Sequence, residues 1–440
     1  MYRCRDCGYR ALKWLGRCPQ CGTWESLVEV SETLSARPTA VPQALADIPI
    51  SDAQRVTTGI AEFDRVLGGG LVAGSVLLVG GEPGIGKSTL LFQVAAQFAR
   101  LSAAPVLYVS GEEAPAQIKL RADRLRLDFP SPLLILHEQN LSAICEQIVQ
   151  TKAALVVIDS IQTVFPEGLG ESIGMPHQVG QAAFALNQIA KAQKIPIFLI
   201  GHITKSGDFA GPKAIEHLVD VALYLEGGRE SDVRILRAVK NRYGSTEEIG
   251  VFQMRAEGLV EIANPSQFFI ERHETVPPGS VIVPSLEGTR PILIEIQALV
   301  APTNSSYPQR RAMGVDFNRV ALLLAVIEKH LGAQISREDV YVNVAGGLSV
   351  RETATDLGIA LALVSSFKNR AIEGRTVVVG ELGLAGEVRR VKRLKERLTE
   401  AAKLGYERAV IPKGERLHEL VELETIAVRN LREAVEALDL

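Results

Sequence analysis

The segment from Gly81 to Ser88, which reads GEPGIGKS, has the residue types and the spacing of a phosphate-binding loop. Its glycines allow backbone N–H groups to surround an anionic phosphate that side chains would otherwise keep out. Lys87 reaches the β- and γ-phosphates in such a loop, and the hydroxyl of Ser88 is placed to bind Mg²⁺. An apolar run precedes the loop and a helix-like segment follows it, as the motif requires. We therefore expect ATP and Mg²⁺ to bind at Gly81, Glu82, Pro83, Gly84, Ile85, Gly86, Lys87, Ser88 and Thr89.

Carboxylates follow two further apolar runs. The segment ALVVIDS brings Asp159 to the end of one run, where a carboxylate would meet Mg²⁺ through its water shell. The segment YVSGEE places Glu112 and Glu113 after another run, at the sheet edge where ligands of open α/β folds bind. Either glutamate is a candidate for the base that orients the attacking water, although an exposed acidic turn would have the same sequence.

Four of the five cysteines form two Cys-x-x-Cys pairs, Cys4 with Cys7 and Cys18 with Cys21. In a reducing compartment this spacing favours a tetrahedral zinc site over disulfides. A module of roughly thirty residues cannot bury enough core to fold alone, so a structural Zn²⁺ would supply the folding energy. The module also carries five basic residues together with Trp14 and Trp24. This mix suits a nucleic-acid or protein contact, or a solvated face around a small aromatic core.

Six short apolar runs alternate with helical segments in the next part of the chain, which predicts a parallel sheet covered by helices on both faces. The runs are 76–79, 106–109, 133–136, 155–158, 195–200 and 221–225. The preceding stretch, from residue 30 to 52, is rich in Ser, Thr, Ala and Pro and is predicted to be a linker.

The composition is ordinary for a soluble protein, and 440 residues suffice for two or three domains. A formal charge of −3 gives the whole chain no attraction to nucleic acid, so DNA would have to meet local basic clusters or a ring that concentrates them. No run of about 18 apolar residues is present. The first residues, MYRCRDCG, do not form a hydrophobic signal segment, so we expect a cytoplasmic protein without a membrane partner.

Several motifs together resemble the RadA (Sms) family of bacterial DNA repair proteins, and the likeness covers almost the whole chain. They are the two cysteine pairs, TTGIAEFDRVLGGG, YVSGEE, VVIDS and KNRYG, in which Tyr243 replaces the family's phenylalanine. The resemblance implies an α/β fold with a RecA-like P-loop ATPase core, in which helices lie on both faces of a mostly parallel sheet. It implies a zinc ribbon at 1–29, the linker at 30–52, the ATPase domain at 53–263 and a Lon-protease-like α/β domain at 264–440.

The resemblance also implies roles for individual residues. Glu112 would be the catalytic base, and His202, after the fifth run, would sense the γ-phosphate. Lys240 and Arg242 would reach the nucleotide of the neighbouring subunit, which implies a ring, by family likeness a homo-hexamer. Without the resemblance, His202 would be interpreted as a structural histidine and KNRYG as a solvated hairpin turn.

Two polar loops at 165–178 and 203–216 are similar to the loops that line the DNA channel of RecA-like rings. Lys205 and Lys213 in the second loop are then candidate DNA-phosphate contacts, together with Lys240 and Arg242. Such contacts would be independent of DNA sequence and sensitive to salt.

The segment from 264 to the end resembles the proteolytic domain of Lon in PSLEGTRPILIEIQALV, in the stretch that contains DLGIA, and in GELGLAGEVRRVKRLKERL. Asp356 stands where the nucleophilic serine of that family would be, and Lys395 matches its dyad lysine. A carboxylate cannot replace the acyl-accepting hydroxyl, so we expect no peptidase activity. Lys395 would then belong to a basic surface with Arg389, Arg390, Lys392, Arg393 and Arg397.

The function expected from the resemblance is that of an ATP-driven DNA motor of recombinational repair, associated with the bacterial nucleoid. It would act on single-stranded and branched DNA beside a RecA-type recombinase, in branch migration or heteroduplex extension. Two other interpretations are a nucleotide-switched loader or adaptor and an ATP-dependent peptidase.

Overall fold

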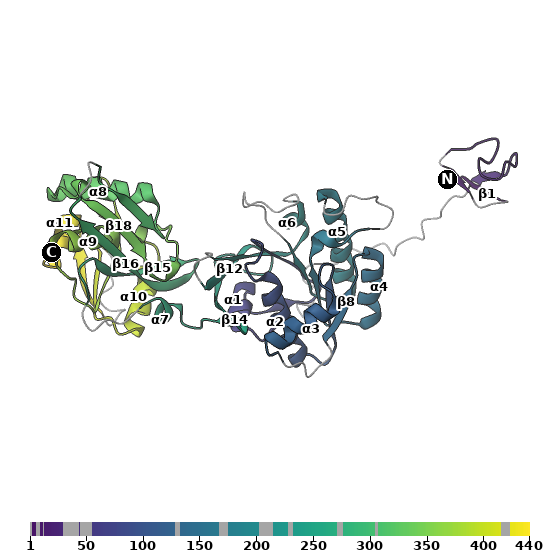
Figure 1. Cartoon of the computed structure of the whole chain (residues 1–440), viewed down its shortest axis with the longest axis horizontal. Coiled ribbons are helices and arrows are strands. Elements are labelled where there is room, and N and C mark those ends of the chain that lie inside the picture. Colours follow the sequence, from purple (N-terminus) through teal and green to yellow (C-terminus); the bar gives the residue numbers. More distant parts are fainter. Residues whose placement is uncertain are drawn as a thin grey trace. The chain divides into compact units, whose positions relative to one another are not determined.

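The computed structural model describes residues 2–5, 9–11, 13–29, 44, 55–127, 133–166, 175–201, 214–227, 232–270, 276–303, 307–414 and 423–440. The chain divides into two compact units, Met1–Asp52 and Ala53–Leu440 (Figure 1). Four candidate site residues lie outside the described residues, namely Cys7, His202, Lys205 and Lys213.

The first unit contains a small antiparallel sheet with the strand order β2-β1-β3, formed by β1 (Tyr2–Cys4), β2 (Arg10–Ala11) and β3 (Leu27–Glu29). Cys4, Cys18 and Leu27 form its buried cluster, and Tyr9 packs against them. Trp14 and Trp24 are 55% and 70% exposed, so the two tryptophans do not build this core.

The second unit contains, among its described residues, a nine-stranded sheet with the order β14-β13-β12-β11-β6-β10-β9-β7-β8. The strands from β11 to β8 run parallel, and each of the six predicted apolar runs corresponds to one of them, although the strand in the run 195–200 begins only at Ile197. These are β6 (Val76–Gly81), β7 (Val106–Ser110), β8 (Leu133–His137), β9 (Leu155–Asp159), β10 (Ile197–Ile200) and β11 (Val221–Glu226). An antiparallel extension follows, made of β12 (Val233–Asn241), β13 (Ile249–Arg255) and β14 (Gly258–Glu261).

Helices cover both faces of this sheet because successive residues of its central strand point to opposite sides. In β6, Leu77 and Val79 join the cluster that contains α1 and α2, whereas Val76 and Leu78 join the cluster that contains α4 and α5. The helices on this sheet are α1 (Ala61–Leu67), α2 (Lys87–Leu101), α3 (Pro115–Arg124), α4 (Leu141–Thr151), α5 (Pro176–Gln193) and α6 (Ala214–Leu218). The short strands β4 (Arg55–Val56) and β5 (Leu71–Val72), which flank α1 in the sequence, form a separate antiparallel pair. The fold is thus the expected RecA-like α/β arrangement.

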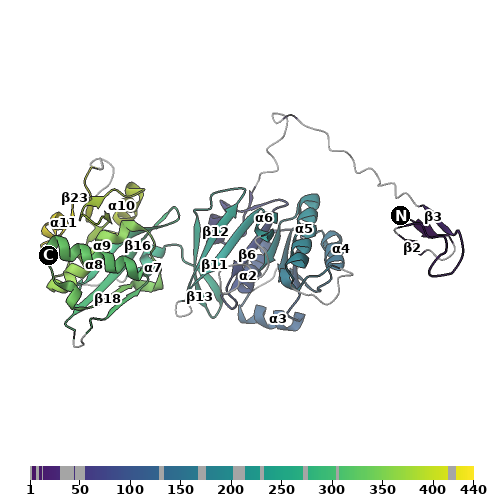
Figure 2. The ribbon, with the colours of Figure 1, turned by 90° about the horizontal axis from the view of Figure 1, so that it is seen from above.

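A second sheet, of seven strands among the described residues, forms the C-terminal part in the order β17-β18-β16-β15-β19-β22-β23. Figure 2 shows α8 and α9 lying across it. The strands are β15 (Ser280–Glu287), β16 (Arg290–Ala301), β17 (Arg310–Met313), β18 (Asp339–Val344), β19 (Thr376–Val378), β22 (Arg408–Pro412) and β23 (Glu424–Val428), and a separate hairpin joins β20 (Glu381–Leu382) to β21 (Val388–Arg389). The helices are α7 (Pro265–Phe269), α8 (Phe317–Leu331), α9 (Asp356–Lys368), α10 (Leu394–Lys403) and α11 (Leu431–Ala437).

The predicted place of Arg397 in a basic surface is wrong, because Arg397 is only 1% exposed. Its guanidinium donates to both carboxylate oxygens of Glu352, at 2.7 and 2.6 Å, and to the backbone oxygen of Pro284 at 2.6 Å. In α10 the residues 394, 397, 398 and 401 are all buried, which is the spacing of one helix face. Arg397 therefore lies on the inner face of α10, whereas Lys392, Arg393 and Lys395 are exposed.

No helix in the described part of the chain combines the length and the apolar character that a membrane crossing requires.

Candidate functional site

The predicted phosphate-binding loop lies between the end of β6 at Gly81 and the start of α2 at Lys87. Gly81 has a φ of 157°, and a Cβ at this position would come within 2.6 Å of the backbone oxygen of Leu225. Gly84 has a φ of 79°, and a Cβ there would meet no protein atom within 4 Å. The loop thus packs tightly against β11 at one side and borders open space at the other, as a cradle for phosphate groups requires.

The ammonium group of Lys87 is held inside this loop. It donates to the backbone oxygens of Gly81 at 2.8 Å and Glu82 at 2.9 Å, and the residue is only 4% exposed. Burial lowers the pKa of Lys87 to about 8, although the carboxylates of Asp159 and Glu112 act to raise it. A positive charge with so little water around it suits a polyanionic ligand, because phosphate oxygens can replace the backbone acceptors.

Ser88 and Asp159 come together at the carboxyl edge of the sheet. Ser88 lies in the first turn of α2 and Asp159 is the last residue of β9, and the hydroxyl of Ser88 donates to Oδ1 of Asp159 over 3.2 Å. A hydroxyl and a carboxylate at this distance are the hard oxygen ligands that Mg²⁺ prefers. These two side chains therefore fit a Mg²⁺ ion bound beside the phosphate loop.

Glu112 and Glu113 follow β7 and have different partners. Oε1 of Glu112 accepts a hydrogen bond of 2.7 Å from the hydroxyl of Ser160, the residue after Asp159. Glu113 instead forms an ion pair of 3.0 Å with Arg121 of α3. Ser110 pairs with Asp159 across β7 and β9, which brings both glutamates to the same edge as the phosphate loop. The sequence motifs do not single out Ser160, because its role depends on a contact between two strand ends.

The KNRYG motif lies at the amino-terminal ends of the parallel strands, opposite the strand ends that carry the phosphate loop. Lys240 and Asn241 are the last two residues of β12, so the expectation that the whole motif forms a turn after the strand is wrong for these two. Asn241 pairs with Val221, which in turn pairs with Leu77 near the start of β6. The phosphate loop of the same chain begins at the other end of β6. Lys240 and Arg242 thus lie at the end of the strands away from the phosphate loop of the same chain.

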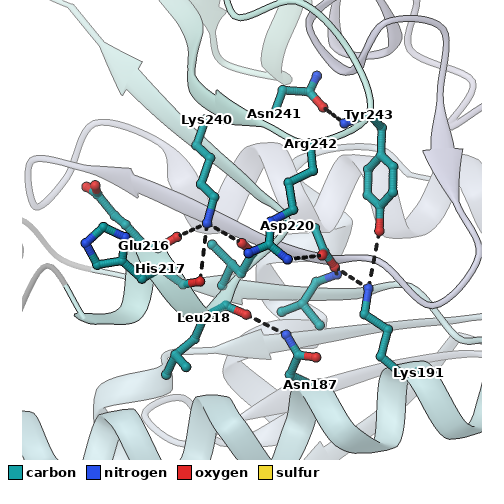
Figure 3. Close-up of polar contacts among 12 residues, drawn as sticks. Asn187, Lys191, Glu216, His217, Leu218, Asp220, Lys240, Asn241, Arg242 and Tyr243 are labelled. Carbon is teal, nitrogen blue, oxygen red and sulfur yellow. Dashed lines mark hydrogen bonds and ion pairs between the residues drawn. The ribbon is translucent and has the colours of Figure 1, made fainter.

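The ammonium group of Lys240 contacts the end of α6 (Figure 3). It donates to the backbone oxygens of Glu216 at 2.6 Å and Val219 at 2.8 Å, and lies 3.3 Å from that of His217. These carbonyl groups belong to the carboxyl end of the helix, where a cation is favoured. Burial lowers the pKa of Lys240, and the neighbouring Arg242 lowers it further.

Asp220 connects the KNRYG motif to the interior of the sheet (Figure 3). Its carboxylate accepts hydrogen bonds from Lys191 of α5 at 2.6 Å and from the backbone N–H of Val76 at 3.0 Å. The guanidinium of Arg242 lies 3.6 Å from the same carboxylate, and the side chain of Arg242 is 58% exposed. The Tyr243 hydroxyl accepts from Lys191 at 3.2 Å. Arg242 is therefore oriented by Asp220 and still open to solvent.

The thiols of Cys4, Cys18 and Cys21 form a cluster in which all sulfur atoms lie within 4.8 Å of one another. The sulfur atoms of Cys4 and Cys21 are 3.6 Å apart. Three converging thiols fit a tetrahedral Zn²⁺ site, for which Cys7 is the expected fourth ligand outside the described residues.

Asp356, at the position of the Lon nucleophile, is the first residue of α9 and is 5% exposed. It forms an ion pair with Arg319 of α8. Burial raises the pKa of the Asp356 carboxyl group despite this arginine. Lys395, the dyad-lysine position, is exposed on α10.

The chain is similar to known families and proteins along most of its length. Residues 40–208 match the family model of the AAA domain, residues 2–29 match the rubredoxin metal-binding domain, and residues 315–415 match subunit ChlI of Mg-chelatase. The chain is 46% identical to DNA repair protein RadA of Bacillus subtilis over 445 residues, which covers 98% of this chain and 97% of that protein. It is 45% identical to DNA repair protein RadA of Aquifex aeolicus, with 99% and 98% covered.

Among solved structures, a KaiC-like protein of Pyrococcus horikoshii matches with 21% identity and a TM-score of 0.40, over 48% of this chain and 99% of that one. A second solved structure, itself an ATPase domain, matches with 16% identity and a TM-score of 0.42, over 48% of this chain and 92% of that one.

Proposed function

The chain belongs to the RadA family of DNA repair proteins, and we propose that it is an ATP-hydrolysing motor that moves along DNA in recombinational repair. The proposed substrates are single-stranded and branched DNA, and the proposed outcome is branch migration or extension of a heteroduplex. The observation that carries the proposal is the group of Lys87, Ser88, Asp159 and Glu112 at one edge of the RecA-like sheet.

Each member of this group has a distinct part in hydrolysis. The backbone of the loop and Lys87 bind the phosphates, and Ser88 and Asp159 would hold Mg²⁺, which when bound neutralises charge on the β- and γ-phosphates. Glu112, held by Ser160, accepts a proton from the water that attacks the γ-phosphate. Because Glu113 is paired with Arg121, we assign the base to Glu112.

The second part of the proposal is that Arg242 and Lys240 act on the nucleotide of a neighbouring subunit in a homo-hexameric ring. Their position at the sheet edge opposite the phosphate loop supports action between subunits, and the exposure of Arg242 leaves it accessible to a partner. A guanidinium suits the task because it neutralises transition-state charge and does not deprotonate. His202, as the sensor of the γ-phosphate, remains a proposal from family likeness.

DNA would pass along the loops that follow β9 and β10. Lys205 and Lys213 are the proposed phosphate contacts, and cycles of ATP binding and hydrolysis would tighten and release the grip of the loops on one strand. The RecA-type recombinase is the proposed partner, and the bacterial nucleoid is the proposed place of action. The buried ion pair of Asp356 with Arg319 supports a scaffold role for the C-terminal domain in place of peptide hydrolysis.

The steady-state ATPase rate, measured with and without single-stranded DNA over a series of salt concentrations, tests this function. The Lys87→Ala protein serves as the blank. We expect DNA to stimulate hydrolysis and the stimulation to fade with salt, because phosphate contacts release counterions. An ATPase rate that does not respond to DNA at any salt concentration would contradict the motor and favour a switch driven by a protein partner.

A further inference from the structure

Tyr108 lies in β7 with its side chain fully buried, and the mechanism proposed above gives it no role. Its ring packs edge-on against Phe92 of α2, with the ring centroids 5.3 Å apart. A phenylalanine would make the same ring contact. A buried phenol hydroxyl, in contrast, needs a hydrogen-bond partner to offset its loss of water. The identity of that partner therefore bears on the role of Tyr108.

The partner is the carboxylate of Asp159. The hydroxyl of Tyr108 donates to Oδ2 over 2.5 Å, while Oδ1 of the same carboxylate accepts from Ser88 over 3.2 Å. Both oxygens of the Asp159 carboxylate thus accept a hydrogen bond, one from Tyr108 inside the sheet and one from Ser88 at the end of the phosphate loop. A carboxylate anchored at Oδ2 keeps Oδ1 directed at the hydroxyl of Ser88, which is where the two side chains fit Mg²⁺.

Arg121 of α3 lies behind this contact. Its Nη2 donates to the hydroxyl oxygen of Tyr108 over 3.3 Å, and its guanidinium carbon lies 5.2 Å from the ring centroid of Phe92 and 5.9 Å from that of Tyr108. The side chain of Arg121 is 10% exposed and also pairs with Glu113. A donor to the phenol oxygen polarises the O–H bond, so the hydrogen bond from Tyr108 to Asp159 becomes stronger.

We propose that Tyr108 and Arg121 are positioning residues for ATP hydrolysis, which hold the Asp159 carboxylate in the orientation that Mg²⁺ requires. This inference rests on the ATPase function proposed above. Arg121 orients and polarises the hydroxyl of Tyr108, and Tyr108 fixes Asp159. Neither residue touches the nucleotide. They therefore affect the affinity for nucleotide in the presence of Mg²⁺ and the rate of hydrolysis. They do not affect the affinity for nucleotide in the absence of the metal.

The dependence of nucleotide affinity on Mg²⁺ distinguishes a positioning role of Tyr108 from a role in folding alone. A Tyr108 that merely filled space would change the unfolding temperature when altered, but it would leave the Mg²⁺ requirement of nucleotide binding unchanged. Partners that orient metal-binding carboxylates typically alter metal affinity or activity by about ten- to a hundredfold when they are removed.

The test uses the full-length Tyr108→Phe protein, which keeps the ring and removes the hydroxyl. Binding of a fluorescent ADP analogue is titrated with Mg²⁺ and repeated in EDTA. We expect unchanged affinity in EDTA, and a Mg²⁺ concentration for half-maximal enhancement of binding that rises by about tenfold. We also expect kcat to fall by about tenfold, with KM for ATP at saturating Mg²⁺ within about twofold of the wild-type value because nucleotide contacts are retained.

Tyr224→Phe is the matched control, since Tyr224 lies in β11 of the same sheet and donates to Glu216 over 2.7 Å, not to Asp159. Its Mg²⁺ titration should match that of the wild-type protein. Arg121→Met is a second variant, which retains packing on the rings and loses the hydrogen bond to Tyr108. It should shift the Mg²⁺ titration in the same direction as Tyr108→Phe by a smaller factor.

Wild-type Mg²⁺ dependence and kcat in a folded Tyr108→Phe protein would overturn the inference. An equal loss of affinity with and without Mg²⁺ would also overturn it, because the change would then act on the whole phosphate loop. If Tyr108→Phe fails to fold, Arg121→Met is judged by the same two outcomes. A wild-type protein that binds nucleotide with Mg²⁺ but hydrolyses no ATP would contradict the proposed function, while the Mg²⁺ titration would still decide this inference.

Discussion

The hydroxyl of Ser160 donates to Oε1 of Glu112 over 2.7 Å, so the residue next to Asp159 holds one of two adjacent glutamates. The other glutamate, Glu113, is neutralised by Arg121 at 3.0 Å. Two neighbouring residues of the same type thus have different electrostatic surroundings. This difference allows their contributions to be separated by experiment.

We expect Glu112→Gln to reduce kcat by about a hundredfold or more, since it removes the base while preserving the shape of the side chain. Nucleotide binding with Mg²⁺ should persist. Glu113→Gln should retain most of the activity. Single-turnover ATP hydrolysis checks both variants, and the assignment is wrong if Glu113→Gln is the more damaging change.

The pKa of about 8 for Lys87 predicts a pH dependence of ATP binding. Phosphate oxygens raise the pKa of the bound ammonium group, so above pH 8 each binding event takes up a proton that the free protein lacks. Below pH 8 the group is protonated in both states, and no proton is taken up. Affinity should therefore fall as pH rises above 8, by up to about tenfold per pH unit.

Calorimetry at pH 9 in buffers of different ionisation enthalpy measures this proton uptake. Lys87→Arg is the control, because its guanidinium does not titrate in this range. Whatever ATP affinity this variant retains should not involve uptake of a proton at residue 87. Equal affinity at pH 7 and pH 9 would show that the amine of Lys87 stays charged in the free protein.

Arg242→Ala is expected to lower kcat with little effect on stability, since the side chain is 58% exposed and its ion pair is long. Lys240→Ala should lower kcat and also destabilise the protein by about 1 kcal/mol or more, because carbonyl groups at the end of α6 lose their donor. Thermal unfolding and ATPase assays distinguish the two effects. Normal DNA-stimulated ATPase and strand movement in Lys240→Ala would remove this motif from the mechanism.

A mixing experiment tests action between subunits directly. Lys87→Ala protein should be inactive alone and Arg242→Ala protein should have a low rate, whereas a mixture should recover part of the wild-type rate. Some interfaces in the mixture then combine an intact phosphate loop with an intact Arg242. The recovered rate should be lost when both changes are placed in the same chain. A mixture that stays inactive under conditions where the subunits exchange would argue against an arginine supplied by the neighbour.

Removal of zinc should unfold the first unit. Its buried cluster consists of Cys4, Cys18 and Leu27 among the described residues, so two of the three members are themselves thiol ligands. We expect one Zn²⁺ per chain in the wild-type protein and none in Cys18→Ser, together with rapid proteolysis within residues 1–52. ATPase activity without DNA should be preserved, and a Cys18→Ser protein that retains Zn²⁺ would contradict the site.

The buried pair of Arg397 and Glu352 provides a test of stability. Glu352→Gln leaves an arginine of 1% exposure without its countercharge, and should destabilise the protein by about 3 kcal/mol or more. Asp123→Asn is the control, because it breaks an ion pair with Lys119 in which both side chains are more than half exposed, and should cost under about 1 kcal/mol. Urea unfolding of both variants checks this, and similar losses would show that burial does not strengthen the first pair.

The sequence predicts those parts of the molecule whose structure is determined by residues close to one another along the chain. The phosphate loop, the six parallel strands and the cysteine pairs each have their signal within a few residues. The basic run around Arg397 predicts an exposed residue, yet the spacing of Arg397 from Leu394, Leu398 and Ala401 places it on the buried face of α10. Its partner Glu352 is 45 residues away, and no local pattern indicates it.

The same limit applies to the site. The contact of Tyr108 with Asp159 spans 51 residues, and that of Lys240 with Glu216 spans 24. Both depend on how segments that are distant in the sequence pack together, which the sequence of one segment does not contain. The polarity of Tyr108 within an apolar run was the available signal, because a phenol in a fully buried strand must have a partner.

Strand β6 connects the two edges of the ATPase sheet that carry the phosphate loop and the KNRYG motif. Its first residue, Val76, is tied to Asp220 beside Arg242, and its last residue, Gly81, opens the loop around Lys87. In mechanical terms β6 is a short rigid element, because backbone pairing with β10 on one side and β11 on the other restrains it. In the proposed ring, the nucleotide of a neighbouring subunit would displace one end of β6, and the strand would transmit this displacement to the subunit's own nucleotide. The subunits would then hydrolyse ATP in sequence around the ring and not independently.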